Sequence, residues 1–504
     1  MTPGHRPDGA EVAGAERIDV EVVDVAVIGA GVVGAAIARA LSRFDVVTAL
    51  VDAGDDVGTG TSKANTAIRH TGFDAVPGSL ESALLRRGYP LLAEFAERVG
   101  IPLEETGAHL VAWDDAQLAA LDGIARKARA NGYVDARPVA VDELYRREPH
   151  LGPGARGALH IPGEGIICPF TTPLALATDA VVHGVRLRLG ARVTGVERRG
   201  PLHRLRLAGP ASGHLDARWV VNAAGLGSDV VDRLFGHDGF TITPRRGELI
   251  VHDKLARPLV NSVLLPVPNA VTKGVLVAPT VFGNVLLGPT AEDVEDRTDT
   301  ATTAAGLRSL RAAGGRVVPA LLAEEVTAVY AGLRAATEHS DYQLRADPDG
   351  RYVCVAGIRS TGLSASLGIA AHVVDLLLDA GLTLLPRRDD VRPVRMPPLG
   401  EAMRRPHADS AAIRADPAFG DLVCHCERVT RGEIVAAAAS PVPARTLDGL
   451  RRRTRALLGR CQGFACSARV TALFAQASGV PADRLLGLDG TDGTDGTEGT
   501  GGAP

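Results

Sequence analysis

The alternation of apolar and polar positions divides the chain into an α/β body and a small cysteine-bearing segment. A β-branched run from Val22 to Gly31 ends in glycines, which predicts a strand that turns directly into a helix. Strand and helix patterns then alternate to about residue 385. Such alternation is typical of α/β folds.

The same pattern predicts the domain boundaries. The stretch after the body is rich in Pro and Arg with little apolar periodicity, which is typical of a linker. The final residues repeat Asp, Gly and Thr and cannot bury a core. The predicted segments are a flexible tail (1–20), the α/β body (21–385), a linker (386–417), a small domain (418–486) and a low-complexity tail (487–504).

The composition bears on three properties: nucleic-acid binding, membrane insertion and cellular location. A net charge of −4 and an aromatic content of 4% give no reason to expect nucleic acid as a partner. No run of about 18 uncharged apolar residues occurs, so we expect no transmembrane segment. The N-terminus lacks the pattern of a signal peptide, which favours a cytoplasmic location. Peripheral contact with the inner face of the membrane through a partner stays open.

The stretch VDVAVIGAGVVGAAIARAL contains a GxGxxG motif made by Gly29, Gly31 and Gly34. It stands between a predicted strand and a predicted helix, which is the context in which this motif binds a dinucleotide. The glycines permit a tight turn, close approach of a pyrophosphate and close packing of the helix on the strand. Asp52 ends the next strand, where a carboxylate can accept hydrogen bonds from ribose hydroxyls. A glycine-rich turn without a ligand is the alternative, and the motif alone does not separate FAD from NAD.

Three later segments separate these two cofactors: residues 58–74, 219–229 and 352–374. With them the body resembles the FAD-dependent family that includes D-amino-acid oxidase and glycerol-3-phosphate dehydrogenase. Within that family it is most similar to the anaerobic glycerol-3-phosphate dehydrogenase large subunit. Further matching stretches are GEGIICPF, PRRGELIV, GNVLLGPTAEDVEDR and YAGLRA.

The resemblance implies an α/β fold with a Rossmann-like FAD-binding domain and a mixed-sheet substrate domain. The first would comprise about residues 21–75, 151–235 and 331–385, and the second about residues 76–150 and 236–330. The glycine turn would hold the ADP half of FAD, a Thr-Ser-Lys turn would lie near the pyrophosphate, and the loop before the last helix would contact the flavin ring. The FAD-binding residues expected on this basis are Gly29, Ala30, Gly31, Val32, Val33, Gly34, Asp52, Thr61, Ser62, Lys63, Ala224, Gly225, Gly357, Ser360, Thr361, Gly362 and Leu363.

The resemblance also implies a catalytic histidine. Related glycerol-3-phosphate-oxidising enzymes have a His–small–Gly step after the flavin-contacting turn, and here that step is His70–Thr71–Gly72. An imidazole, with an ordinary pKa of about 6.5, suits removal of the substrate's hydroxyl proton. The alternative is a histidine that only hydrogen-bonds the flavin or fills a loop. Arg69, just before it, stands where an apolar residue is common in the family.

Substrates of this family carry an anionic group, so an arginine is expected opposite it. Arg334 in GLRA occupies the position of the family's substrate-binding arginine, although Ala335 replaces the usual proline. Arg246 and Arg359 are further candidates. A planar guanidinium can grip a carboxylate or phosphate with two hydrogen bonds. Each arginine could instead pair with a structural carboxylate.

Four cysteines near the C-terminus form two close pairs: Cys424 and Cys426, then Cys461 and Cys466. Such a cluster suits one iron–sulfur cluster or one zinc ion. The spacing and the stretches LVCHCERVTRGEI and GRCQGFAC resemble the bacterioferritin-associated ferredoxin-like [2Fe-2S] domain, which implies that these cysteines hold a [2Fe-2S] cluster. The arginine run 451–455 could offset the cluster's negative charge, or it could be a solvated helix face.

Together these patterns predict a dehydrogenase that oxidises a small anionic hydroxy compound. By resemblance the substrate is glycerol 3-phosphate, and electrons pass through the cluster to a quinone or an acceptor protein. An L-2-hydroxyglutarate or amino-acid dehydrogenase on the same scaffold is an alternative. So is an electron-transfer or redox-sensing subunit of a larger complex with a partner subunit.

Overall fold

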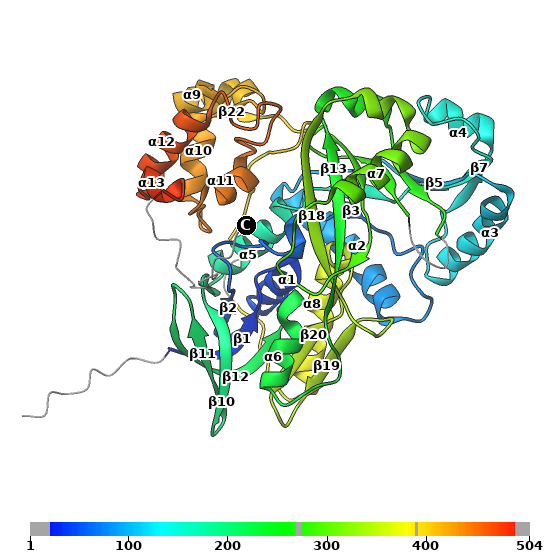
Figure 1. Cartoon of the computed structure of the whole chain (residues 1–504). Coiled ribbons are helices and arrows are strands. Elements are labelled where there is room, and N and C mark those ends of the chain that lie inside the picture. Colours follow the sequence, from blue (N-terminus) through cyan, green and yellow to red (C-terminus); the bar gives the residue numbers. More distant parts are fainter. Residues whose placement is uncertain (1–20, 269–273, 389–391, 489–504) are drawn as a thin grey trace, which may run out of the picture.

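The computed structural model describes residues 21–268, 274–388 and 392–488. Three parts make up the molecule: a mainly parallel sheet with its helices, a mixed sheet with its own helices, and a C-terminal lobe of short helices (Figure 1). The predicted α/β body is confirmed, and so is the predicted small, mainly helical C-terminal domain.

The first sheet is eight-stranded and parallel at its centre. Its buried first strand, β1 (Glu21–Ile28), pairs in parallel with β2 on one side and β12 on the other. β12 pairs in parallel with β20, while β10, β11 and β19 add antiparallel pairs at the margins. The remaining bounds are β2 (Thr48–Val51), β9 (Arg186–Arg188), β10 (Arg192–Arg199), β11 (Leu202–Ala208), β12 (Gly213–Asn222), β19 (Gln343–Asp347) and β20 (Tyr352–Ala356).

Helices cover both faces of this sheet. On one face α1 (Val32–Leu41) packs against α5 (Thr171–Val182) and α8 (Gly362–Asp379), and α8 packs against α2 (Leu80–Val99). These helices and the sheet share the largest apolar core of the molecule. The opposite face has its own smaller core, to which α6 (Ser228–Leu234) contributes. The crossover helices therefore fix the ends of the central strands, where cofactors bind in such folds.

The second sheet is mixed and nine-stranded. Its long strands β13 (Thr243–His252) and β18 (Val326–Ala336) form an antiparallel pair. α3 (Asp115–Ala130), α4 (Val141–Arg147) and α7 (Ala304–Val317) lie with this sheet on the side away from the first one (Figure 1). The other strands are β5 (Ala108–Ala112), β6 (Arg137–Val139), β7 (Gly157–Ile161), β14 (Val263–Pro266), β15 (Leu276–Pro279), β16 (Val285–Gly288) and β17 (Glu292–Asp293).

A third, small sheet joins the two large ones. It consists of β3 (Ile68–Arg69), β8 (Gly165–Ile167) and β4 (Leu103–Glu104), all antiparallel. β3 ends immediately before His70, so this sheet sets the position of the predicted catalytic histidine.

The C-terminal lobe packs short helices around an apolar core that includes Val423, Leu450 and Phe474. Its elements are β21 (Leu422–Cys424), β22 (Val429–Thr430), α10 (Arg431–Ala439), α11 (Leu447–Thr454), α12 (Ser467–Ser478) and α13 (Ala482–Leu485). α10 begins with a capping box in which Thr430 and Glu433 bond reciprocally to each other's backbone N–H groups.

Two features differ in detail from the predicted boundaries. The region predicted as a linker is partly ordered against the body, since Met396, Leu399 and Arg405 are buried and α9 (Ser410–Ala415) is helical. β7 lies in a segment predicted for the FAD-binding part, yet it pairs with β5 and β6 of the second sheet.

Candidate functional site

The glycine turn after β1 has the geometry that a bound dinucleotide requires. Gly29 has a φ of +104°, and a Cβ there would lie 2.3 Å from the carbonyl oxygen of Ala223. A Cβ at Gly34 would lie 1.8 Å from the carbonyl oxygen of Gly29. Only glycine fits either position, so α1 starts directly against the turn and presents its N-terminal N–H groups.

Asp52 is tied to this turn. Its carboxylate accepts hydrogen bonds from the backbone N–H of Ala30 at 2.5 Å and from that of Gly54 at 2.7 Å. Burial raises the pKa of Asp52, although these N–H groups oppose the effect. Ser62, in the short helix η1 (Thr61–Lys63), accepts a hydrogen bond from Val32 N–H at 2.9 Å, so the Thr-Ser-Lys turn lies at the start of α1.

Four segments far apart in the sequence meet beyond this turn. Thr61 Oγ1 donates to the carbonyl of Leu333 in β18 at 2.6 Å. Tyr330 of β18 donates to the carbonyl of Asn65 at 2.9 Å. The N–H of His70 donates to Ser364 Oγ, in the first turn of α8, at 2.8 Å. The region next to the glycine turn is therefore surrounded by four elements: η1, the end of β3, β18 and the N-terminus of α8.

The remaining predicted FAD residues lie on loops at the ends of strands in the first sheet. The N–H of Ala224 donates to Asn222 Oδ1 at 3.2 Å, and Gly225 has a φ of +57°. Gly357 has a φ of +68°, and Thr361 donates to Glu81 Oε1 at 2.6 Å just before α8. α8 itself has no side-chain cap at its N-terminus, so its first N–H groups are available to a ligand.

His70 is held by a carboxylate that sequence reasoning missed. Glu164 is fully buried, and its Oε2 lies 2.9 Å from His70 Nδ1. Its Oε1 accepts hydrogen bonds from Thr71 N–H at 2.7 Å and from Thr71 Oγ1 at 2.9 Å. Such a partner fixes the imidazole with Nδ1 toward the carboxylate and Nε2 on the opposite side of the ring. The available signal was the stretch GEGIICPF, which contains Glu164.

The three candidate arginines have different surroundings. Arg246 is buried and bonds Glu292 and Asp299, each at 2.6 Å. Arg359 donates to the backbone carbonyls of Thr337 and His339.

Arg334, like Arg359, is a candidate whose charge no described carboxylate neutralises. Among the residues that the structure describes it has no carboxylate partner, and burial lowers the pKa of its guanidinium. The guanidinium lies over Gly247, where a Cβ would be 2.9 Å from Nη2. A buried cation of this kind suits an anionic ligand better than the ion-paired Arg246 does.

Arg69 is structural. Its side chain is 2% exposed, lies over the ring of Tyr89 at 4.2 Å and bonds Glu105 Oε1 at 2.9 Å. Arg69 stands where the family usually has an apolar residue. It can be buried there because Glu105 pairs with its charge.

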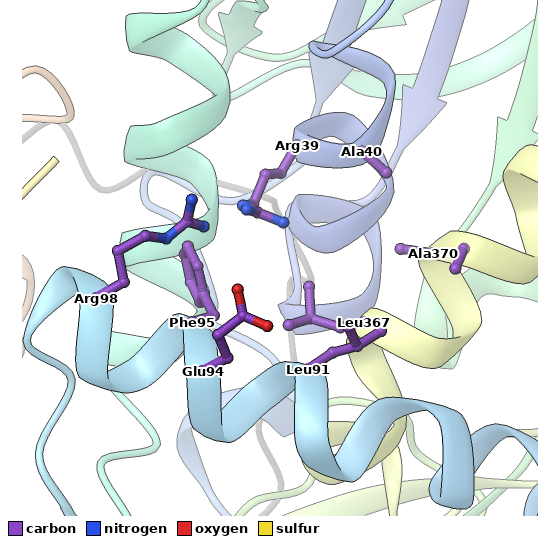
Figure 2. Close-up of a pocket in the computed structure, with 9 residues that line it drawn as sticks. Arg39, Ala40, Leu91, Glu94, Phe95, Arg98, Leu367 and Ala370 are labelled. Atoms are coloured by element: carbon purple, nitrogen blue, oxygen red, sulfur yellow. The ribbon is translucent and has the colours of Figure 1, made fainter. Parts of the chain in front are cut away.

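A cavity of about 820 Å³ opens beside η1 and β18. Its walls include Thr61, Lys63, Asn65, Tyr330 and Leu333 from the α/β body. The C-terminal lobe supplies another wall through Asp448, Arg451, Arg452, Arg455 and Leu458. A second, smaller cleft of about 180 Å³ lies between α1, α2 and α8, where Arg39 and Arg98 flank the ring of Phe95 (Figure 2); it contains no predicted site residue.

The four C-terminal cysteines lie in the lobe as two contacting pairs. The thiols of Cys424 and Cys466 contact each other, and so do those of Cys426 and Cys461. Burial and the neighbouring Cys424 raise the pKa of Cys466 to about 12. Among the described residues, no group of three or more His, Cys, Asp or Glu side chains is arranged closely enough to hold a single metal ion. Two pairs of soft thiolates fit a two-iron cluster, which takes two ligands on each iron, better than a single tetrahedral ion.

The other two cysteines lie in apolar cores. Cys168 and Cys354 are fully buried, and burial raises the pKa of Cys168. An inert thiol is expected at both places.

Comparison with known families assigns both halves of the chain. A family model described as FAD dependent oxidoreductase matches residues 24–376, and one described as BFD-like [2Fe-2S] binding domain matches residues 422–476. The chain belongs to the FAD-dependent oxidoreductase family and carries a BFD-like [2Fe-2S] domain. The glycine turn with Asp52 and the four paired cysteines fit these two cofactors, FAD and a [2Fe-2S] cluster, and the zinc alternative is set aside.

Individual relatives are similar over most of the chain. A glycerol 3-phosphate dehydrogenase of Caloramator mitchellensis is 36% identical over 447 residues, which are 88% of this chain and 92% of that protein. A glycerol 3-phosphate oxidase of Mycoplasma pneumoniae is 29% identical over 68% of this chain and 90% of that protein. The dithionite-reduced, FAD-bound L-α-glycerophosphate oxidase structure from Mycoplasma pneumoniae has a TM-score of 0.71 at 27% identity, covering 75% of this chain and 100% of that one.

One described helix, α8, is long and apolar enough to cross a membrane by length and composition. More than half of it is buried between the first sheet, α1 and α2, and core helices commonly pass the same test.

Proposed function

We propose that this chain is a glycerol 3-phosphate dehydrogenase that passes electrons through its [2Fe-2S] cluster to a quinone or an acceptor protein. The observation that carries the proposal is His70, held by a fully buried Glu164 beside the N-terminus of α8. The similarity to a glycerol 3-phosphate dehydrogenase over 88% of the chain supports the choice of substrate.

Oxidation of a secondary alcohol to a ketone removes one proton from oxygen and two electrons with the hydrogen on carbon. FAD supplies the two-electron acceptor and can release electrons singly to an iron–sulfur cluster. His70 takes the hydroxyl proton at Nε2, because Nδ1 faces Glu164. The negative charge of Glu164 stabilises the imidazolium that forms and keeps the ring in place through its bonds to Thr71.

Arg334 binds the phosphate of the substrate. A buried guanidinium without a carboxylate among the described residues loses hydration and gains most from a dianionic partner. Arg246 and Arg359 hold the neighbouring strands and loop through Glu292, Asp299 and backbone carbonyls, and they position the pocket without contacting the substrate.

The cluster domain has an exposed edge at which a bound [2Fe-2S] cluster would pass electrons to an acceptor. Cys426 is exposed, and Phe464, which lies between Cys461 and Cys466 in sequence, has 94% of its surface exposed. An exposed aromatic side chain beside metal ligands is typical of a surface that contacts another molecule. This edge is where a quinone or an acceptor protein, including a partner subunit, approaches.

The test is anaerobic bleaching of the visible flavin absorbance by glycerol 3-phosphate, compared with L-2-hydroxyglutarate and a panel of amino acids. Rapid bleaching by glycerol 3-phosphate alone is expected. Bleaching by another compound but not by glycerol 3-phosphate would contradict the substrate while leaving the cofactors in place. Bleaching by no compound would favour a subunit that works only with a partner.

A further inference from the structure

The cavity beside η1 is built by both halves of the chain. Lys63 and Asn65 belong to the segment that follows the dinucleotide turn, whereas Arg451 and Arg455 come from the cluster domain, nearly 400 residues later. The cavity is therefore complete only when the cluster domain is docked on the α/β body.

The lining of this cavity combines ion-paired arginines with apolar side chains. Its cations are Lys63, Arg297, Arg451, Arg452 and Arg455, and the four arginines pair with Asp229, Asp448, Asp56 and Glu427 respectively. Its apolar wall contains Phe170 and Phe282, which stack with their ring centres 5.9 Å apart. Of the residues expected to bind FAD, Thr61 and Lys63 line this cavity, whereas His70, Arg334 and the loop 357–363 do not.

The main contact that holds the cluster domain in place is buried and ionic. Asp56 is 2% exposed and accepts hydrogen bonds from Arg452 Nη2 at 2.7 Å and from Arg453 Nη1 and Nη2 at 2.6 and 2.7 Å. Burial alone would raise the pKa of Asp56, but the two arginines outweigh it and lower that pKa. Gly449 in α11 permits the approach, since a Cβ there would be 3.0 Å from Asp56 Oδ2.

Asp56 is also part of the dinucleotide turn's support. It lies between Asp52, which binds the N–H of Ala30, and Gly58, whose N–H donates to the carbonyl of Ala30 at 2.9 Å. A shift of Asp56 is thus transmitted directly to the glycine turn that faces the pyrophosphate.

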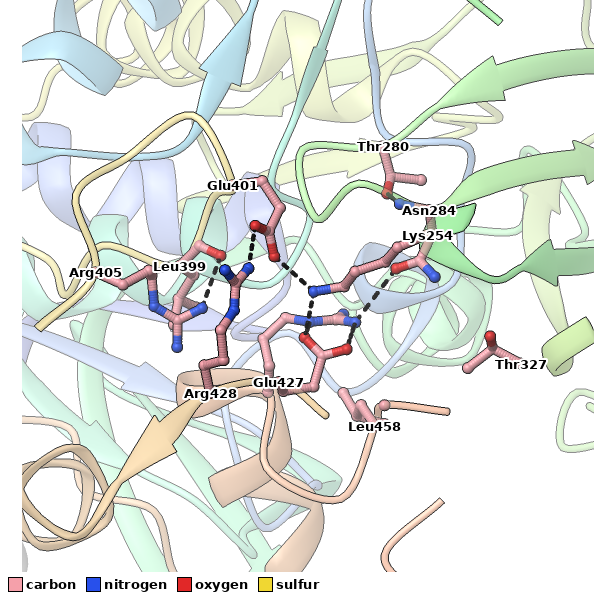
Figure 3. A network of polar contacts seen from close by, with 12 residues as sticks. Lys254, Thr280, Asn284, Thr327, Leu399, Glu401, Arg405, Glu427, Arg428 and Leu458 are labelled. Atoms are coloured by element: carbon pink, nitrogen blue, oxygen red, sulfur yellow. Dashed lines mark hydrogen bonds and ion pairs between the residues drawn. The ribbon is translucent and has the colours of Figure 1, made fainter. Parts of the chain in front are cut away.

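A second network holds the other side of the same interface (Figure 3). Glu427, buried in the cluster domain, bonds Arg455 at 3.0 Å and Lys254 of the α/β body at 3.1 Å. Lys254 also bonds Glu401 at 2.6 Å. Arg455 lies over the ring of Phe282 at 4.0 Å, so a cation of the cluster domain packs directly on the apolar wall of the cavity.

We infer that the Asp56–Arg452–Arg453 contact couples binding of FAD at the neighbouring glycine turn to docking of the cluster domain. The sequence left two interpretations of the arginine run 451–455 open: a solvated helix face, or a counter-charge to the cluster. On this inference its main role is neither of these. It joins the two redox bodies. The inference rests on FAD as the cofactor and is independent of which compound the enzyme oxidises.

Coupling of this kind is reciprocal. If docking of the cluster domain strengthens FAD binding, then FAD strengthens docking by the same factor. Both directions can be measured without turnover: one as the affinity of the apoprotein for FAD, the other as the accessibility of the chain that joins the two bodies.

The experiment uses the full chain and the variants Asp56→Asn and Arg453→Gln, which remove the charge of the contact from either side. FAD affinity of each apoprotein is measured by quenching of flavin fluorescence. Trypsin cleavage within residues 392–417 is compared with and without FAD. Both variants should bind FAD about tenfold more weakly, within the usual range for coupled sites, and FAD should protect the wild-type chain from cleavage much more than the variants.

Asp216→Asn is the matched control. Asp216, near the start of β12, bonds Arg204 of β11 through two contacts of 2.7 Å, and its replacement should leave FAD affinity and protection unchanged. Unchanged iron and sulfide content in each variant shows that the cluster domain is folded. Wild-type FAD affinity in Asp56→Asn or Arg453→Gln, or equal cleavage of apo and FAD-bound wild type, would overturn the inference.

Discussion

Replacing Glu164 by glutamine removes the negative charge that faces His70 and places an amide NH2 group, a donor, opposite His70 Nδ1. The carboxylate lies 2.9 Å from His70 Nδ1, and its other oxygen accepts two bonds from Thr71. Glutamine has the same shape and keeps one oxygen to accept from Thr71, so the loop should hold its conformation. The imidazolium that forms on proton removal would then lack its counter-charge.

The expected loss follows from the distance. Two unit charges about 4 Å apart attract each other by about 4 kcal/mol at an effective dielectric constant of about 20. The amide dipole retains part of this attraction, and we take about half, or about 2 kcal/mol, as the loss. Because each 1.4 kcal/mol or so changes a rate tenfold, loss of the charge alone should slow bleaching of the flavin by roughly 30-fold, and the amide should slow it further by favouring the imidazole tautomer that carries its proton on Nε2.

The assay is stopped-flow flavin bleaching under anaerobic conditions, with saturating glycerol 3-phosphate. Glu105→Gln is the matched control, since Glu105 is a neighbouring carboxylate that is 68% exposed and pairs with Arg69 instead of His70. The control should bleach at nearly the wild-type rate. A wild-type rate in Glu164→Gln, or the same slowing in both variants, would refute the role given to the pair.

Other predictions concern the anion site, the electron relay and stability. Arg334→Lys should raise KM roughly tenfold with a smaller effect on kcat, because an ammonium lacks the two-pronged grip on phosphate, whereas Arg246→Lys should mainly lower the melting temperature. Cys461→Ser should leave flavin bleaching by substrate intact but slow electron transfer to an artificial quinone, and unchanged quinone turnover would argue against the relay. Burial lowers the pKa of His109 to about 3 and that of His160 to about 4, below the value of about 6.5 expected when unfolded. The contribution of these two neutral histidines to the free energy of unfolding is fully present above about pH 6.5 and is lost as the pH falls toward 4. The melting temperature should therefore drop over that range, and less so in His109→Gln.

Local patterns in the sequence predicted much of the structure. The strand–glycine–helix order placed the dinucleotide turn, and Gly29 and Gly34 occupy positions where only glycine fits. The spacing of the cysteines predicted the cluster domain, and Cys424 and Cys466 meet in its core. Both signals are local: each depends on backbone conformation or on ligands within one short segment.

Partners far apart in the sequence escaped prediction. Glu164 reaches His70 across the small sheet through the pairing of β3 with β8, and nothing in either segment alone specifies that contact. The arginines of α11 are polar in sequence, yet Arg453 is buried because Asp56, 397 residues away, neutralises it. A charged residue gives no sequence signal of whether its counter-charge comes from solvent or from a distant segment.

The central claim is that electrons from glycerol 3-phosphate reach the cluster within one chain. The direct measurement is electron paramagnetic resonance of the anaerobic protein after addition of glycerol 3-phosphate, with dithionite-reduced protein as the reference. The account predicts the signal of a reduced [2Fe-2S] cluster together with bleaching of the flavin. A bleached flavin beside a cluster that stays oxidised, although dithionite reduces it, would contradict the relay.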